Sequence, residues 1–114
     1  MVRIYHNNRC SKSRATLALL EQRGDPVEVI NYLDTPPNAD ELTMLLKQLG
    51  MRARELMRTG EPEYQSLGLQ DPSLDDATLI AAMVAHPKLI ERPIVVANGK
   101  AALGRPPEAV LAIL

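Results

Sequence analysis

The sequence predicts an α/β fold: one mixed sheet with a helical insertion between its second and third strands. Three observations lead to this prediction. The first 32 residues read as strand, helix and strand, which is the order of a βαβ unit. A leucine-rich stretch with helix-capping residues and no strand pattern follows. Two short apolar segments joined by an Asn-Gly pair then predict a β-hairpin.

The N-terminal βαβ unit is predicted from its alternation and its turn residues. The segments 2–6 and 27–32 are short, contain β-branched residues and alternate between apolar and polar side chains, as expected of strands. Residues 7–11 contain loop formers, and the leucine- and alanine-rich segment after them favours a helix that Gly24 and then Pro26 close. Because a helix connects the two strands, we expect them to be parallel.

The insertion begins with a strongly patterned helix. Asn38 and Glu41 have the spacing of a capping box, with asparagine as the cap. Leucines at positions 42, 45, 46 and 49 then form one apolar face, and Gly50 ends the helix. A short helix around residues 52–57 is expected next.

The last third of the chain predicts a helix, a hairpin and a final helix. Ser73 and Asp76 repeat the cap spacing at the start of a helix that Pro87 terminates. Residues 93–103 read as the hairpin, and two prolines open a last helix within residues 106–114. The whole order of elements is that of a thioredoxin-like, or glutaredoxin-like, fold with a helical insertion.

Composition limits the classes of function. The 114 residues, with 46% hydrophobic and 24% charged residues, fit a single folded domain over residues 1–114. The net charge of -1 offers no basic excess for nucleic acid. No apolar run is long enough for a membrane span, and the N-terminus lacks the apolar core of a signal peptide. We expect a cytoplasmic monomer.

The single cysteine, Cys10, is the strongest candidate for chemistry. One cysteine permits no internal disulfide, CxxC pair or cysteine-rich zinc site, and two histidines make no metal cluster. Cys10 lies where a strand ends and a helix begins, so unpaired N–H groups and the helix dipole favour its thiolate. Ser11 and Ser13 are candidate extra donors for an oxyanion. The alternative, a buried structural cysteine, is disfavoured by the polar neighbours of Cys10.

Two interpretations of His6 remain open. As a cation beside the loop it would stabilise the thiolate. As a residue at the end of a strand it would hydrogen-bond the backbone of the loop. Both can hold at once.

The segment His6-Asn7-Asn8-Arg9-Cys10-Ser11-Lys12-Ser13-Arg14 closely resembles the active-site loop of ArsC-type arsenate reductases, a thioredoxin-fold family that draws electrons from glutathione and glutaredoxin. The resemblance covers essentially the whole chain. Further blocks occur in the family's order: residues 32–37, 56–58, 64–69, 86–87, 91–96 and 103–106. Two positions in the loop differ from the pattern: Asn8 stands where many relatives have proline, and Ser11-Lys12-Ser13 replaces Gly-Thr-Ser.

The resemblance implies roles for individual residues. Cys10 matches the nucleophile that attacks arsenate to give a thiol-arsenate adduct, and His6 and Ser13 match positions associated with lowering its pKa. Glutathione then displaces the adduct, glutaredoxin reduces the mixed species, and arsenite leaves. Three arginines match those that surround the oxyanion: Arg58, Arg92 and Arg105. Pro93 matches the cis proline beside the active-site loop of thioredoxin-like folds.

Two physical arguments agree with this resemblance. A guanidinium presents a flat fork of donors that suits a tetrahedral oxyanion. Reduction of arsenate takes two electrons, so a chain with one thiol needs a second thiol from outside, which fits glutathione as a co-substrate without a bound cofactor. The same count argues against reductases with an internal cysteine cascade. It also argues against typical Spx-type regulators with a CxxC switch, because Ser13 stands where the second cysteine of that motif would be.

The sequence therefore predicts a glutathione- and glutaredoxin-dependent arsenate reductase of arsenical detoxification. Two alternatives remain. One is a non-catalytic, Spx-like interaction protein that binds a partner such as RNA polymerase. The other is a glutathione-dependent thiol oxidoreductase with a different substrate.

Overall fold

The computed structural model describes residues 2–114, which form two compact units. The sheet unit comprises the chain up to Thr35 together with residues 92–114. The helical unit comprises Pro36–Glu91. The helical insertion predicted between the second and third strands is thus confirmed, while the prediction of a single domain stays a prediction.

The sheet unit contains four strands: β1 (Val2–His6), β2 (Val27–Asn31), β3 (Ile94–Ala97) and β4 (Lys100–Leu103). Their order in the sheet is β2-β1-β3-β4. β1 and β2 are parallel, whereas β1 with β3 and β3 with β4 are antiparallel. The mixed sheet and the parallel βαβ unit are as the sequence predicts. The loop after β1 therefore begins in the centre of the sheet rather than at an edge.

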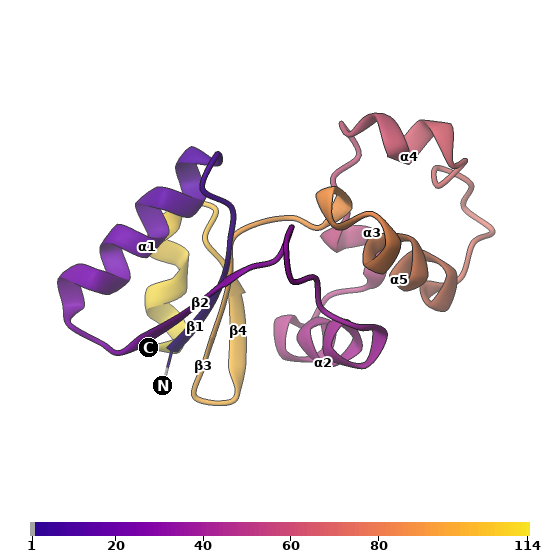
Figure 1. Ribbon diagram of the computed structural model, residues 1–114. Helices are drawn as coiled ribbons and strands as arrows, with labels where there is room; N and C mark the ends of the chain where they lie inside the picture. The colour runs from indigo at the N-terminus through magenta and orange to yellow at the C-terminus, as the bar shows by residue number, and fades with distance from the viewer. Residues whose placement is uncertain (1) are drawn as a thin grey trace. The chain divides into compact units, whose positions relative to one another are not determined.

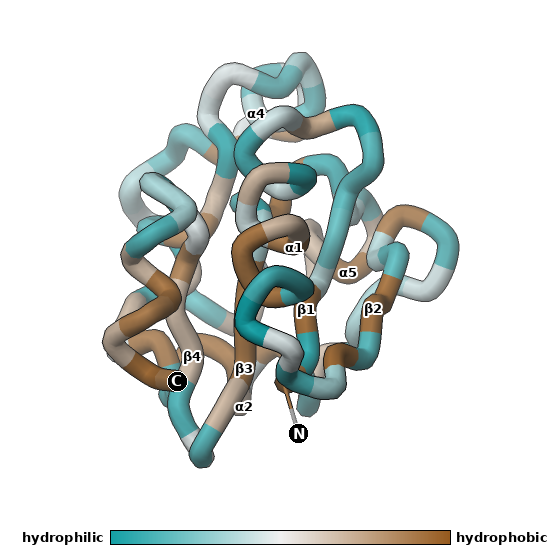
Figure 2. Tube along the Cα trace, turned by 90° about the vertical axis from the view of Figure 1, so that its left-hand side faces the viewer, coloured by the Kyte–Doolittle hydropathy of each residue, from teal (hydrophilic) through white to brown (hydrophobic). Residues whose placement is uncertain are grey.

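Two helices cover one face of this sheet: α1 (Ser11–Arg23) and the 3₁₀ helix η2 (Pro107–Ile113) (Figure 1). The hydrophobic core beneath them joins β1 and β3 to both helices. Its buried members are Val2, Ile4, Leu20, Val95, Ala97 and Val110. Figure 2 shows hydrophobic residues along the central strands β1 and β3. The last helix is wound as 3₁₀, a distinction that the sequence pattern does not make.

Two turns in the sheet unit follow local sequence rules. Gly24 ends α1 in the left-handed conformation at φ 78°. Asn98 and Gly99 both have positive φ values, of 55° and 74°, as a two-residue type I′ hairpin requires.

The inward face of α1 is partly polar. Its buried residues are Ser13, Thr16 and Leu20, so the first half of this face is formed by hydroxyl side chains. The Thr16 hydroxyl donates to the carbonyl oxygen of Lys12 at 2.7 Å, which satisfies it in the interior. The polar half of this face lies at the end of α1 that follows Cys10.

The helical unit consists of short elements: α2 (Ala39–Leu49), α3 (Ala53–Leu56), α4 (Pro62–Ser66), α5 (Asp76–Ala85) and the 3₁₀ helix η1 (Pro87–Leu89). α5 packs against α2 and α3. The capping box of α2 is confirmed, because the Asn38 side chain accepts from the Glu41 N–H at 2.8 Å and the Asn38 N–H donates to the Glu41 carboxylate at 3.4 Å. α4 has no counterpart among the predicted elements.

One predicted cap is wrong. Asp75, not Ser73, caps α5: its carboxylate accepts from the Thr78 N–H at 2.9 Å. Ser73 instead donates its N–H and hydroxyl to the Asp71 carboxylate at 2.9 and 2.7 Å. Several residues that can form caps lie together in this segment, so the spacing of Ser73 and Asp76 alone does not identify the cap.

Within residues 2–114, no helix has the length and apolar character needed to cross a membrane.

Candidate active site

Cys10 is the N-cap residue of α1, directly after the loop that leaves β1. It is half-buried. The loop is held by its own hydrogen bonds: the Cys10 N–H donates to the Asn7 carbonyl at 3.0 Å, and the Arg9 N–H donates to the Asn7 side chain at 2.9 Å. The Arg14 guanidinium donates to the Asn8 carbonyl at 2.8 Å. The cysteine is therefore presented by an ordered turn.

The surroundings of Cys10 favour its thiolate. Partial burial acts to raise the pKa of the thiol, but several neighbours outweigh it and the pKa is lowered from its ordinary value. These are the backbone N–H groups of Ser13 and Lys12, and the Arg92 guanidinium, which acts by hydrogen bonding and by charge. The Cys10 side chain makes no capping hydrogen bond to α1. The N–H groups of the first turn are therefore available to stabilise the sulfur when it is ionised.

A first prediction concerns the pH dependence of this thiol. Because the folded protein favours the thiolate, alkylation of Cys10 by iodoacetamide is expected to reach half its maximal rate below the midpoint of an ordinary cysteine, about 8.5. Alkylation quenched at fixed times and quantified by mass spectrometry across pH 5 to 10 measures that midpoint directly, since the chain has one thiol. The urea-unfolded chain is the internal control, and equal midpoints in both states would contradict the lowered pKa.

His6 and Ser13 form a buried pair behind the loop. The Ser13 hydroxyl and Nδ1 of His6 are 2.7 Å apart, and Nε2 of His6 lies 2.6 Å from Oδ1 of Asn8. The Asn7 N–H donates to the Ser13 hydroxyl oxygen at 3.0 Å. His6 is 3% exposed and Ser13 is fully buried. Thus His6 binds two side chains of the loop and α1 rather than the loop backbone, and the Ser13 hydroxyl faces the interior.

Arg92 and Arg105 meet at the ends of β3 and β4. The Arg105 guanidinium donates to the Arg92 carbonyl at 3.0 Å, directly before Pro93. The Arg92-Pro93 peptide bond is cis, as the family resemblance implies, and the Arg105-Pro106 bond is also cis. Arg92 therefore connects two other predicted site residues within the sheet unit: its guanidinium acts on the Cys10 sulfur and its carbonyl accepts from Arg105.

Gly104, between β4 and Arg105, packs closely against Thr16 of α1 and Pro93. A Cβ atom at this position would lie 2.7 Å from Cγ of Pro93 and would collide with Thr16. The Gly104 N–H donates to the Pro93 carbonyl at 3.0 Å. The absence of a side chain therefore sets how closely Pro93 and α1 pack beside Cys10.

A second prediction follows from this close approach. Gly104→Ala is expected to destabilise the fold by about 1–3 kcal/mol, because the buried Thr16 and Pro93 must move to accept a methyl group. Urea unfolding monitored by circular dichroism measures the loss. Gly60→Ala is the matched control, since nothing lies within 4 Å of a Cβ there, and a change below about 0.5 kcal/mol is expected. Equal losses in both variants would contradict the packing argument.

Arg58 belongs to the helical unit and is paired with carboxylates. Its Nη1 lies 2.7 Å from Glu91 Oε1, and its Nε lies 3.4 Å from Glu61 Oε1. The Arg58 N–H also donates to the Leu89 carbonyl at 2.7 Å, next to the bridge between Met57 and Ile90. An oxyanion that binds this guanidinium must compete with two carboxylates, and its role in substrate binding stays a prediction.

Ser11 is the exposed first residue of α1. Its role as an oxyanion donor stays a prediction. Beside the loop, a polar cavity of about 280 Å³ is lined by six residues and His6: Asn7, Asn8, Arg9, Asn31, Leu33 and Asp34. The exposed part of the loop thus borders a hollow lined mainly by polar residues, of which Cys10 is not one.

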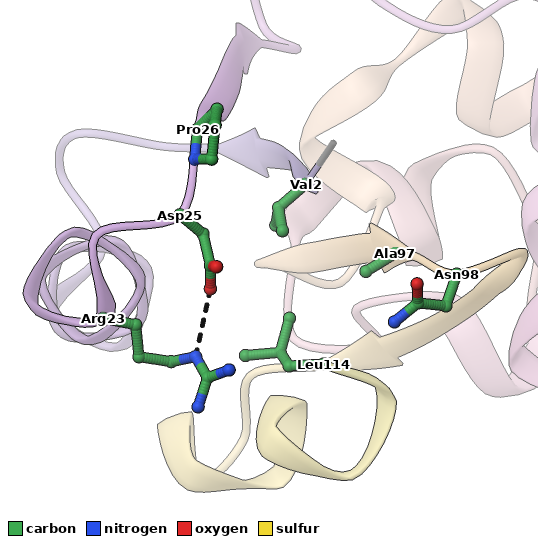
Figure 3. Close-up of a pocket in the computed structure, with 7 residues that line it drawn as sticks. All are labelled: Val2, Arg23, Asp25, Pro26, Ala97, Asn98 and Leu114. Atoms are coloured by element: carbon green, nitrogen blue, oxygen red, sulfur yellow. Dashed lines mark hydrogen bonds and ion pairs between the residues drawn. The ribbon is translucent and has the colours of Figure 1, made fainter.

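A smaller cavity, of about 170 Å³, lies where β1 begins (Figure 3). Its two charged groups, Arg23 and Asp25, form an ion pair with each other at 3.0 Å, and its other lining residues include Val2 and Leu114. None of the predicted site residues lines it. The described residues, 2–114, contain no group of three or more His, Cys, Asp or Glu side chains that could hold a metal ion.

Fold and site together define a class of protein: a thioredoxin-like domain with one cysteine at the start of the first helix and a cis proline beside it. The model of the ArsC family matches residues 5–113. The chain belongs to the ArsC family.

Individual relatives agree over nearly the full length. The chain is 61% identical to the protein YfgD of Escherichia coli K12, over 99% of this chain and 96% of that protein. It is 54% identical to a protein of Neisseria meningitidis serogroup A named arsenate reductase, over 99% and 97% of the two chains. A solved structure described as arsenate reductase from Vibrio cholerae is 58% identical, with a TM-score of 0.97 and coverage of 99% and 97%. These relatives confirm the predicted fold.

Two residues of the site were not predicted from the sequence. The sequence signal for Gly104 is its place between a strand and an Arg-Pro pair, where a glycine indicates close backbone approach. For Asn8 the sequence shows only that it replaces the proline of many relatives. Its hydrogen bond to His6 depends on the shape of the loop, which residue types alone do not give.

Proposed function

We propose that the protein is an arsenate reductase in which Cys10 is the nucleophile. The observation that carries this proposal is the sulfur at the start of α1, facing the Ser13 N–H and the Arg92 guanidinium. This arrangement supplies both an activated thiolate and positive charge for a tetrahedral dianion. The relatives named arsenate reductase, at 54% identity in Neisseria meningitidis and 58% in Vibrio cholerae, support the same substrate.

The overall reaction balances with two thiols. Arsenate and two thiols give arsenite, one disulfide and water, so arsenic gains two electrons and two sulfurs lose one each. In the first step the Cys10 thiolate forms a sulfur–arsenic bond, and an arsenate oxygen leaves as water after protonation. Arg92 would neutralise the charge of the bound oxyanion, and the N–H groups at the start of α1 would bind its oxygens.

The second thiol must come from outside the chain, because Cys10 is the only cysteine. We propose glutathione as this co-substrate and glutaredoxin as the protein that completes the reduction, with no bound cofactor. A reduced glutathione pool is a property of the cytoplasm. We therefore propose a cytoplasmic enzyme that acts as a monomer with arsenate, glutathione and glutaredoxin as its partners.

The test is a coupled assay with the purified full chain, glutathione, glutaredoxin, glutathione reductase and NADPH. Arsenate-dependent oxidation of NADPH is expected, together with arsenite measured by chromatography and mass spectrometry. Omission of glutaredoxin should slow the reaction, whereas omission of glutathione should stop it.

Two further arms separate the alternatives. A mixed disulfide offered in place of arsenate tests for a general thiol oxidoreductase, and reduction of the disulfide without reduction of arsenate would replace the present proposal. The absence of any turnover with either substrate would favour a non-catalytic interaction protein.

A further inference from the structure

We propose that Asn8 is a positioning residue: its side-chain oxygen selects one tautomer of His6 and thereby fixes Ser13 against the loop that presents Cys10. The inference rests on the reactive Cys10 of the proposed function. It concerns how this chain holds the loop at a position where many sequences with the family's pattern have proline.

The first step is the contact between Asn8 and His6. Oδ1 of Asn8 is an acceptor only, and it lies 2.6 Å from Nε2 of His6. A hydrogen bond at this distance requires the proton on Nε2. The other neutral tautomer would set two lone pairs against each other.

The second step follows from the hydroxyl of Ser13. Its oxygen already accepts the Asn7 N–H at 3.0 Å, so its own hydrogen is available to be donated. Once Nε2 of His6 carries the ring proton, Nδ1 is an acceptor, and the Ser13 hydroxyl donates to it at 2.7 Å. The hydrogen-bonding atoms of the buried His6 and Ser13 side chains then each have a complementary partner.

The third step connects Ser13 to the sulfur. The Ser13 side chain is fully buried and bound at both its hydrogen and its oxygen, which fixes the residue in the first turn of α1. Its backbone N–H is one of the groups that stabilise the Cys10 thiolate, beside the Lys12 N–H and the Arg92 guanidinium. The hydrogen bonds that fix the Ser13 side chain therefore also fix the direction of its backbone N–H relative to the Cys10 sulfur.

Asn8 is suited to this role because it is anchored twice. Its carbonyl accepts from the Arg14 guanidinium at 2.8 Å, while its side chain reaches back to His6. Proline has no side-chain acceptor, so a loop with proline at this position must rely on another way to orient the imidazole. The Asn8 amide thus orients the His6 imidazole in this loop by a direct hydrogen bond.

The test combines three variants of Asn8 with two measurements that do not need arsenate. In the wild-type protein, ¹⁵N NMR of the imidazole should show the Nε2–H tautomer of His6. Asn8→Ala should give a mixture of tautomers and slow the alkylation of Cys10 at pH 7 by about 2- to 10-fold, the effect of one hydrogen bond. Asn8→Asp keeps an acceptor oxygen and should retain the proton on Nε2 of His6, whereas Asn8→Leu should behave as Asn8→Ala.

Asn31→Ala is the matched control, because it removes an exposed amide at the end of β2 without touching the hydrogen bonds of His6. It should change neither readout. A wild-type spectrum with the proton on Nδ1 would overturn the inference, and so would an Asn8→Ala protein with unchanged tautomer and alkylation rate. Lack of arsenate turnover with the expected NMR and alkylation results would refute the proposed function and leave the role of Asn8 intact.

Discussion

Replacement of Cys10 by serine is expected to abolish arsenate-dependent turnover and, at the same time, to make the protein more stable. Activity is lost because a serine hydroxyl is not ionised at neutral pH and cannot replace the thiolate as a nucleophile. Stability should rise because the residue is the N-cap of α1 and its thiol forms no complete cap. Serine is a preferred N-cap and can accept from the N–H groups of Lys12 or Ser13.

Cys10→Ala separates the two effects. It also lacks a nucleophile but cannot cap the helix, so it should be as inactive as Cys10→Ser and less stable by about 0.5–2 kcal/mol. Thermal unfolding should be measured below the alkylation midpoint, where the wild-type thiol is neutral. Residual turnover in Cys10→Ser would contradict the role of the nucleophile, and equal stability of the two variants would contradict the cap. The expected exchange of stability for activity is typical of functional sites.

Local sequence signals correctly predicted several helix ends and turns of the fold. Gly24, the Asn98-Gly99 turn and the capping box at Asn38 act within a few residues, so their sequence neighbours are sufficient to determine them. Gly24 ends α1 and the Asn98-Gly99 turn joins β3 to β4. The position of Cys10 follows from the loop-forming residues 7–11 between β1 and α1. The error at Ser73 shows the limit of such signals, because Asp71 and Asp75 lie close enough to compete for the same roles.

The contacts that complete the site join distant parts of the chain and were not predictable from residue types. The fit of Gly104 against Thr16 depends on residues 88 positions apart, and the pairing of Arg58 with Glu91 spans 33 positions. The family resemblance predicted that the three arginines surround the oxyanion. It could not show that one of them already carries carboxylate partners, since an ion pair leaves no periodic pattern in the chain.

Arg92→Ala is expected to lower kcat/KM for arsenate by about 10- to 100-fold, the effect of one charge-assisted hydrogen bond of about 1.5–3 kcal/mol. The guanidinium acts on two groups: it stabilises the Cys10 thiolate, and it would neutralise charge on the oxyanion. The alkylation midpoint of Cys10 should therefore move up in the same variant. Lys88→Ala is the control, because Lys88 is an exposed cation four positions earlier and should leave both measurements unchanged.

Arg92→Lys distinguishes charge from geometry. An ammonium keeps the positive charge beside the sulfur, so the alkylation midpoint should stay near that of the wild type. It lacks the planar fork that matches two oxygens at once, so arsenate turnover should stay close to that of Arg92→Ala. Recovery of turnover in Arg92→Lys would mean that the site needs charge alone at this position. Equal losses in Arg92→Ala and Lys88→Ala would mean that Arg92 contributes only to the overall electrostatic field of the protein. The proposal that Arg92 binds the oxyanion would then be wrong.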